Sequence, residues 1–141
     1  MDEKTRQHAR PLSKRAAEYL DRAGHPDNAD TPERIAELFS TAGLSSFAVV
    51  IDAFYQFGGY VLPMGSERRF KVYRAKEAIR LMRREGTSSE DPELFRIPIG
   101  QSETIQAFFR MDGHGRIYED DRPISDSLIA WIEQWASQPP R

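Results

Sequence analysis

Apolar residues recur at intervals of three and four along much of the chain, a spacing that places them on one face of a helix. The pattern predicts five helices, over residues 12–23, 32–42, 47–57, 75–84 and 128–136. Thr31 before Pro32 is typical of a helix start, because a hydroxyl can accept from free N–H groups and proline fits the first turn. Ser125 is the predicted cap of the last helix.

Alternation of apolar residues with other residues marks the strands. It predicts five strands, around residues 60–62, 70–72, 95–99, 105–111 and 117–118. Asp112-Gly113 is predicted to make the tight turn between the last two, because glycine accepts a positive φ. Trp131 and Trp135 should pack the last helix on the sheet. The order of elements predicts an α+β fold in which an antiparallel β-sheet packs against several α-helices.

Length and composition favour one cytoplasmic domain. The 141 residues are predicted to form a single domain, 1–141, with residues 1–11 as a frayed N-terminal extension. No apolar run exceeds five residues and the first fifteen residues are rich in charge, so we expect neither a transmembrane segment nor a signal peptide. The chain has no cysteine, which excludes disulfides, thiolate catalysis and Cys-ligated metals.

The formal net charge of −2 hides an uneven distribution. Residues 61–89 sum to +5 and residues 90–141 to −5. The cations that could meet phosphate are Arg68, Arg69, Lys71, Arg74, Lys76, Arg80, Arg83 and Arg84. The acids that could meet a basic partner form two sets, Glu90, Asp91 and Glu93, and Glu119, Asp120 and Asp121. Either group could also be solvated surface.

No residue pattern points to catalysis. His8, His25 and His114 are predicted to lie in the N-terminal extension, a turn and a hairpin tip, and no zinc or serine-nucleophile motif occurs. The run from Glu119 to Asp121 is more typical of a solvated loop than of a tuned acid–base pair. We expect no enzyme activity, no catalytic residue, no cofactor, no metal and no small-molecule substrate.

Four short patterns occur in an order that resembles the SUKH superfamily. They are Leu20-Asp21-Arg22-Ala23-Gly24, Phe57-Gly58-Gly59-Tyr60, Ile97-Pro98-Ile99-Gly100 and Asp112-Gly113-His114-Gly115-Arg116-Ile117-Tyr118. The tryptophan that commonly follows Ala-Gly in the family is His25 here. The likeness runs from about Leu12 to Ala136, is strongest to the third, immunity-type subgroup of bacterial members, and implies a SUKH-like α+β fold.

The resemblance implies a bacterial immunity protein that neutralises a cognate toxin domain, for instance a nuclease, by direct stoichiometric binding. The candidate partner-binding residues are then Glu90, Asp91, Glu93, Glu119, Asp120 and Asp121, because acidic patches attract a basic toxin. Two alternatives remain open: a regulatory scaffold that binds endogenous proteins, and a nucleic-acid-binding module that uses the helix 75–84. Nucleic acid is the less favoured partner, because the chain is mildly acidic and the basic segment holds only Phe70 and Tyr73 as aromatics.

Overall fold

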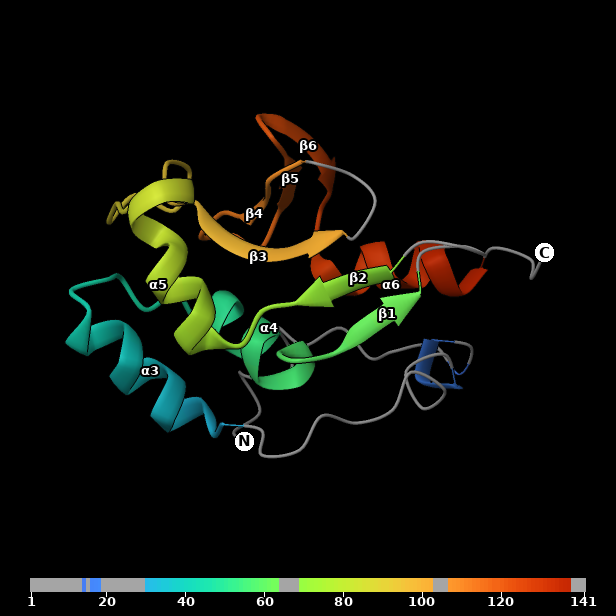
Figure 1. Cartoon of the computed structure of the whole chain (residues 1–141), viewed down its shortest axis with the longest axis horizontal. Coiled ribbons are helices and arrows are strands. Elements are labelled where there is room, and N and C mark those ends of the chain that lie inside the picture. Colours follow the sequence, from blue (N-terminus) through green and yellow to red (C-terminus); the bar gives the residue numbers. More distant parts are fainter. Residues whose placement is uncertain (1–13, 15, 19–29, 64–68, 103–106, 138–141) are drawn as a thin grey trace.

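The computed structural model describes residue 14 and residues 16–18, 30–63, 69–102 and 107–137. Six strands of these residues form one antiparallel sheet in sequence order, β1 (Val61–Pro63), β2 (Arg69–Val72), β3 (Ile97–Ser102), β4 (Phe109–Met111), β5 (Ile117–Glu119) and β6 (Arg122–Ser125). The helices around the sheet are α3 (Pro32–Thr41), α4 (Ala48–Phe57), α5 (Ala75–Glu85) and α6 (Leu128–Ser137) (Figure 1). The predicted α+β class is confirmed.

Helices α3, α4 and α5 follow the predicted ranges closely. The N-cap of α3 is Thr31, whose hydroxyl accepts from the backbone N–H of Arg34 at 3.1 Å. Of the predicted helix 12–23, only residues 14 and 16–18 are described, and they are helical. The extension 1–11 lies outside the described residues. No helix of the described residues is both long and apolar enough to cross a bilayer.

Strand β3 lies at the centre of the core, with all four residues from Ile97 to Gly100 buried. A register shift pairs Pro98 with Arg110 and Gly100 with Phe109, so that Pro98 and Gly100 point to opposite faces. Pro98 faces the C-terminal end of α5, where a Cβ added at Gly86 would lie 3.2 Å from the proline ring. Both faces of β3 are therefore covered, which explains its continuous burial.

The opposite face of the sheet carries the aromatic core under α6. The Trp131 ring lies 5.0 Å from that of Phe70 on β2 and 5.3 Å from that of Phe109 on β4. Trp135 lies 5.7 Å from Phe70. Figure 1 shows α6 behind β2. The prediction that the two tryptophans pack the last helix on the sheet is confirmed.

The β4–β5 hairpin differs from the predicted tight turn. Met111 pairs with Ile117, and the backbone N–H of Asp112 donates to the carbonyl of Arg116, so three residues form the loop. The positive φ occurs at Gly115, at 91°, and not at Gly113. In the predicted strand 105–111 only Phe109–Met111 is β-structure, and residues 103–106 lie outside the described residues.

Strand β6 was not predicted at all. Its sequence, Arg122 to Ser125, contains Pro123 and does not alternate in burial. An edge strand tolerates both features, because one side of its backbone has no ladder partner. The segment forms a strand by pairing with β5, which directly precedes it in the chain.

The cap of α6 is Ser127, and the predicted cap Ser125 is wrong. The Ser127 hydroxyl accepts from the backbone N–H of Ala130 at 3.0 Å, whereas the Ser125 hydroxyl donates to the Ser127 carbonyl. We expect Ser127→Ala to lower the free energy of unfolding by about 1 kcal/mol, since an N-terminal N–H of α6 loses its acceptor. Ser125→Ala should have a smaller effect. Urea denaturation of both variants measures the difference, and a larger loss at Ser125 would contradict the assignment.

Candidate protein interface

The acids Glu119, Asp120 and Asp121 lie at the turn between β5 and β6. Glu119 pairs with Arg122 in the ladder, and their side chains form an ion pair with an N–O distance of 2.5 Å. Asp120 has a φ of 54°, an uncommon conformation that aspartate tolerates better than most residues. The Asp121 side chain is fully exposed, 3.9 Å from the guanidinium of Arg110. The turn thus holds Glu119 in an ion pair and leaves the Asp121 carboxylate in solvent.

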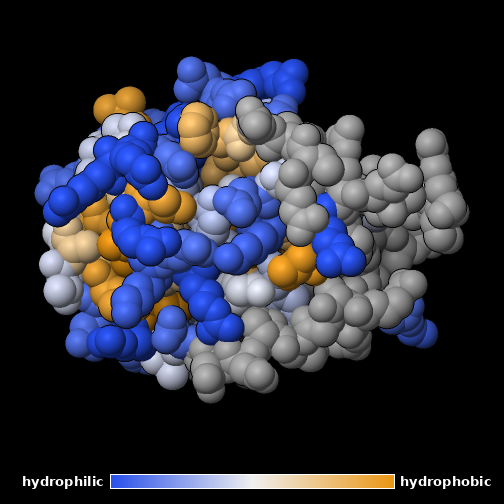
Figure 2. Space-filling model, viewed as in Figure 1, coloured by the Kyte–Doolittle hydropathy of each residue, from blue (hydrophilic) through white to orange (hydrophobic). Residues whose placement is uncertain are grey.

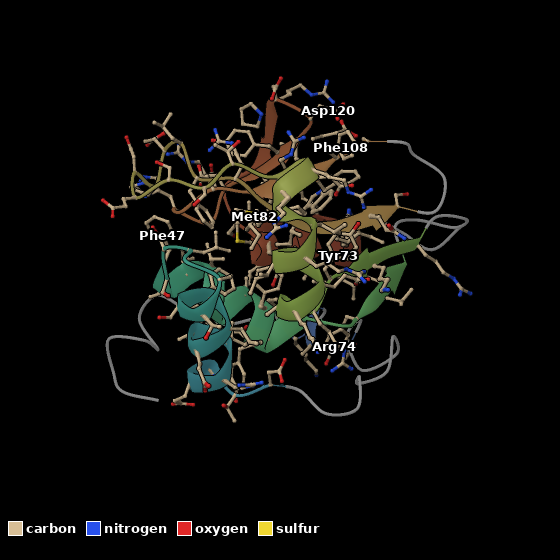
Figure 3. The ribbon with its side chains drawn as sticks, turned by 60° about the vertical axis from the view of Figure 1, so that its left-hand side comes forward. Phe47, Tyr73, Arg74, Met82, Phe108 and Asp120 are labelled. Carbon is tan, nitrogen blue, oxygen red and sulfur yellow. The ribbon has the colours of Figure 1, made fainter. Side chains whose placement is uncertain are left out.

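An exposed aromatic side chain, Phe108, lies beside this turn. Its backbone N–H donates to Oδ1 of Asp120 at 3.0 Å, and its carbonyl accepts from the Asp120 N–H at 2.7 Å. The residue remains 49% exposed, with the guanidinium carbon of Arg110 5.2 Å from the ring centroid. Figure 3 shows Phe108 and Asp120 close together beyond the end of α5. We call Phe108, Asp120 and Asp121 the Phe108 surface, whereas Glu119 pairs with Phe109 in the β4–β5 ladder and so lies on the opposite face of the sheet.

The other acidic set lies in the loop between α5 and β3. Oδ1 of Asp91 accepts from the backbone N–H of Glu93 at 2.9 Å, and the Asp91 carbonyl accepts from the N–H groups of Leu94 and Phe95. These bonds fix a tight turn that leaves the Leu94 side chain 61% exposed. Among the described residues, Glu90 has no hydrogen-bond or ion-pair partner. We call Glu90, Asp91 and Leu94 the Leu94 surface.

Glu93 connects this loop to the β4–β5 hairpin. Its Oε1 lies 2.6 Å from Nη2 of Arg116 and 3.2 Å from Nε2 of His114. The hydrogen bond to Glu93 raises the pKa of the Arg116 guanidinium. Glu93 is thus already paired within the fold. The sequence predicted that it binds a partner, and in the structure it also holds the loop to the hairpin.

Asp112 holds the hairpin itself and is completely buried. Its Oδ1 accepts from the backbone N–H groups of His114 and Arg116, at 2.9 and 3.0 Å. Its Oδ2 accepts from the Tyr118 hydroxyl at 2.9 Å and lies 3.1 Å from Nε of Arg116. Burial of Tyr118, together with its bond to Asp112, raises the pKa of the phenol. The network fixes the hairpin against which the acidic loop packs, through the Gly113 N–H and the Pro92 carbonyl.

The two acidic sets do not form one surface. The hairpin that holds the Glu93 loop is at one end of β5, and the Asp120 turn is at the other. A partner that contacts both would have to span the β4–β5 hairpin. The structure therefore places the predicted acids in two separate regions, each with one exposed apolar side chain.

Phe108 and Leu94 were not among the predicted site residues. The alternation that predicted a strand over 105–111 assigned Phe109 and Met111 to the core, and by the same alternation Phe108 points to the other face. This alternation was the sequence signal that could have identified Phe108 as a surface residue. Leu94 follows no periodic pattern, and only the turn set by Asp91 exposes it.

The predicted basic helix is α5, with Lys76, Arg80, Arg83 and Arg84 exposed. Figure 2 shows hydrophilic side chains spread over the region that α5 occupies in Figure 1. Phe70 and Tyr73 are core residues. Burial, with the charges of Glu85 and Glu77, raises the pKa of Tyr73 to about 12, and its hydroxyl donates to Oε1 of Gln101.

Few groups in the described residues are placed for proton transfer. His8 and His25 lie outside those residues, and His114 is half-exposed beside Glu93. Burial raises the pKa of Asp52 on α4, although its bond with Gln56 opposes the shift. The described part of the chain contains no group of three His, Cys, Asp or Glu side chains that could hold a metal.

Comparison of the chain with protein-family models, with curated proteins and with solved structures finds no match. The resemblance to the SUKH superfamily therefore stays a prediction from four sequence patterns.

Proposed function

We propose that this chain is an immunity-type inhibitor that binds a cognate toxin domain directly, in the cytoplasm, and catalyses no reaction. The observation that carries the proposal is the Phe108 surface, an exposed aromatic side chain beside the carboxylates of Asp120 and Asp121. The SUKH-like patterns of the sequence supply the class of partner. The target's contact face is basic, as in a nuclease domain that binds phosphates.

The Phe108 surface has the properties of an interface anchor. Binding energy at protein interfaces concentrates in a few residues, with aromatic side chains prominent among them. Two backbone bonds to Asp120 hold Phe108 in place before a partner arrives, which lowers the conformational entropy lost on binding. The surrounding carboxylates attract a basic partner and raise the association rate. An inhibitor of this kind acts by covering its target's active face.

The Phe108 surface supports this role better than the Leu94 surface. Phe108 offers an aromatic ring whose centroid is 5.2 Å from the Arg110 guanidinium carbon, with Asp120 and Asp121 beside it. On the Leu94 surface only Glu90 and Asp91 face solvent freely, because Glu93 is paired with Arg116 and His114. The larger, aromatic anchor favours the first surface.

Co-expression tests the function. A toxin-like domain encoded beside this gene should arrest growth alone, and this chain should restore growth and co-purify with the toxin as a complex of fixed stoichiometry. Absence of a tight complex with that domain contradicts the proposal. Recovery of several unrelated endogenous partners from the native cell, with no toxin among them, supports the scaffold alternative instead.

Phe108→Ala should weaken the complex by about 30-fold or more, the size of effect that defines an anchor residue. Leu94→Ala is the matched control, since it also truncates an exposed apolar side chain beside acids, and should change affinity less than threefold. Isothermal titration calorimetry measures both. A larger loss at Leu94 would move the interface to the other surface. Asp121→Lys should mainly slow association, and more so at low salt.

A further inference from the structure

A row of cations on α5 takes no part in the proposed interface. Lys76, Arg80, Arg83 and Arg84 are all exposed. At 3.6 residues per turn they fall within an arc of about 100° and extend over about 12 Å of the helix axis. Of the two acids of the helix, Glu85 lies outside this arc, and Glu77 lies at its edge, where its carboxylate pairs with Arg80.

Strand β2 extends the stripe. Nζ of Lys71 lies 3.5 Å from Oε1 of Glu77, and Nη2 of Arg80 lies 3.8 Å from Oε2 of the same carboxylate. One carboxylate thus brings a strand cation beside a helix cation. Arg69 shares the exposed face of β2 with Lys71. The cationic row consists of Arg69, Lys71, Lys76, Arg80, Arg83 and Arg84.

We propose that the cationic row binds the phosphate backbone of a nucleic-acid duplex without reading its sequence. Arginine guanidinium and lysine ammonium groups donate hydrogen bonds to phosphate oxygens. Such contacts supply essentially all of the affinity in non-specific binding of proteins to nucleic acids. Single strands are a poorer fit, because stacking of bases requires exposed aromatics and both Phe70 and Tyr73 are buried.

A membrane surface is also a poorer fit. The opposite face of α5, with Ala75, Ala78 and Met82, is buried in the core, so the helix has no free apolar face to insert among lipids. The row can therefore make charge contacts only. A duplex backbone presents phosphates in a regular, rigid array that suits a straight stripe on a helix.

The acidic net charge of the chain does not oppose this binding. Screening limits interactions between exposed charges to about 8 Å at physiological ionic strength. The Phe108 surface adjoins the C-terminal end of α5, where Arg110 contacts both the Glu85 carbonyl and Asp121, whereas Lys71 lies against Glu77 in the first turn, at the other end (Figure 3). Local charge along the row, and not the total of −2, determines its potential.

Fluorescence anisotropy with a labelled 20-base-pair DNA duplex tests the proposal. The intact chain should bind with a dissociation constant of roughly 1–100 µM, weakening steeply between 50 and 200 mM salt. Lys76→Gln/Arg83→Gln should bind at least about tenfold more weakly at 100 mM salt, with a salt slope smaller by about 2. Neither residue has an ion pair among the described residues, so the variant should fold normally.

Arg34→Gln/Arg122→Gln is the matched control. It removes the same charge from α3 and β6, at the cost of two exposed ion pairs, and should bind as the intact chain does. No binding at 50 mM salt, or equal losses in the two double variants, overturns the proposal. So does preferential binding to phosphatidylserine vesicles or to a single strand of the same length. Circular dichroism confirms that each variant is folded.

Discussion

Replacing Asp112 with alanine is expected to lower the free energy of unfolding by about 3 kcal/mol or more, because a fully buried carboxylate that satisfies three hydrogen-bond donors is lost. The carboxylate has four polar partners and no exposure. Alanine would leave the Tyr118 hydroxyl and two backbone N–H groups without their acceptor. Urea denaturation followed by circular dichroism measures the loss, which is a large part of the stability of an ordinary domain.

Two further variants identify the cause. Asp112→Asn keeps an oxygen for the two backbone N–H groups but replaces Oδ2, which accepts from the Tyr118 hydroxyl and pairs with Arg116, by an amide NH₂ group, so it should cost less than Asp112→Ala but more than nothing. Asp121→Ala removes a fully exposed carboxylate and should change stability by less than about 0.5 kcal/mol. A loss below 1 kcal/mol in Asp112→Ala would mean that the network does not hold the hairpin.

The same network supports the Leu94 surface from a distance. The hairpin that Asp112 fixes bonds to the acidic loop at Pro92, and Arg116 bonds to Glu93. Weakening Asp112 should therefore loosen that loop before it affects the Phe108 surface at the other end of β5. Hydrogen exchange of the Leu94 and Phe95 amides, which donate to Asp91, reports this order.

Local signals predicted the helices well. The cap at Thr31 and the apolar stripe of α5 act within a few residues of each other, so the chain itself specifies them. Strand β6 and the cap at Ser127 depend on tertiary context. Arg122 to Ser125 becomes a strand because β5 lies beside it, and that pairing then moves the start of α6 beyond Ser125.

The candidate site was predictable only in its charges. Composition located both acidic sets, but contacts between residues distant in sequence decide what each acid does. Glu93 meets Arg116 23 residues later, and Asp120 meets Phe108 12 residues earlier. Both contacts join separate segments of the chain, and a periodic pattern within one segment cannot reveal them. The ion pair of Glu93 and the role of Phe108 as an anchor were therefore not predicted.

The SUKH-like pattern Ile97-Pro98-Ile99-Gly100 ends in a glycine that close packing requires in this fold. Replacing this glycine is the second substitution with a large expected effect. A Cβ added at Gly100 would lie 2.3 Å from the Lys71 carbonyl oxygen and 2.5 Å from the Phe70 ring. Gly100→Ala should therefore destabilise the chain by about 3 kcal/mol, through overpacking, although glycine to alanine in an open strand is usually stabilising. Denaturation measures the loss.

Gly43→Ala separates overpacking from backbone strain. Gly43 has a φ of 74° and no atom within 4 Å of an added Cβ, so alanine there should cost only about 1–2 kcal/mol of strain. Gly100→Ala should also alter the fluorescence of Trp131, because the Phe70 ring that it displaces lies 5.0 Å from that indole. The nearest atom to the added methyl is a backbone oxygen, so Phe70→Leu should not restore the lost stability. Full recovery in that double variant would show that the ring alone, and not the close approach of β2 to β3, requires glycine at this position.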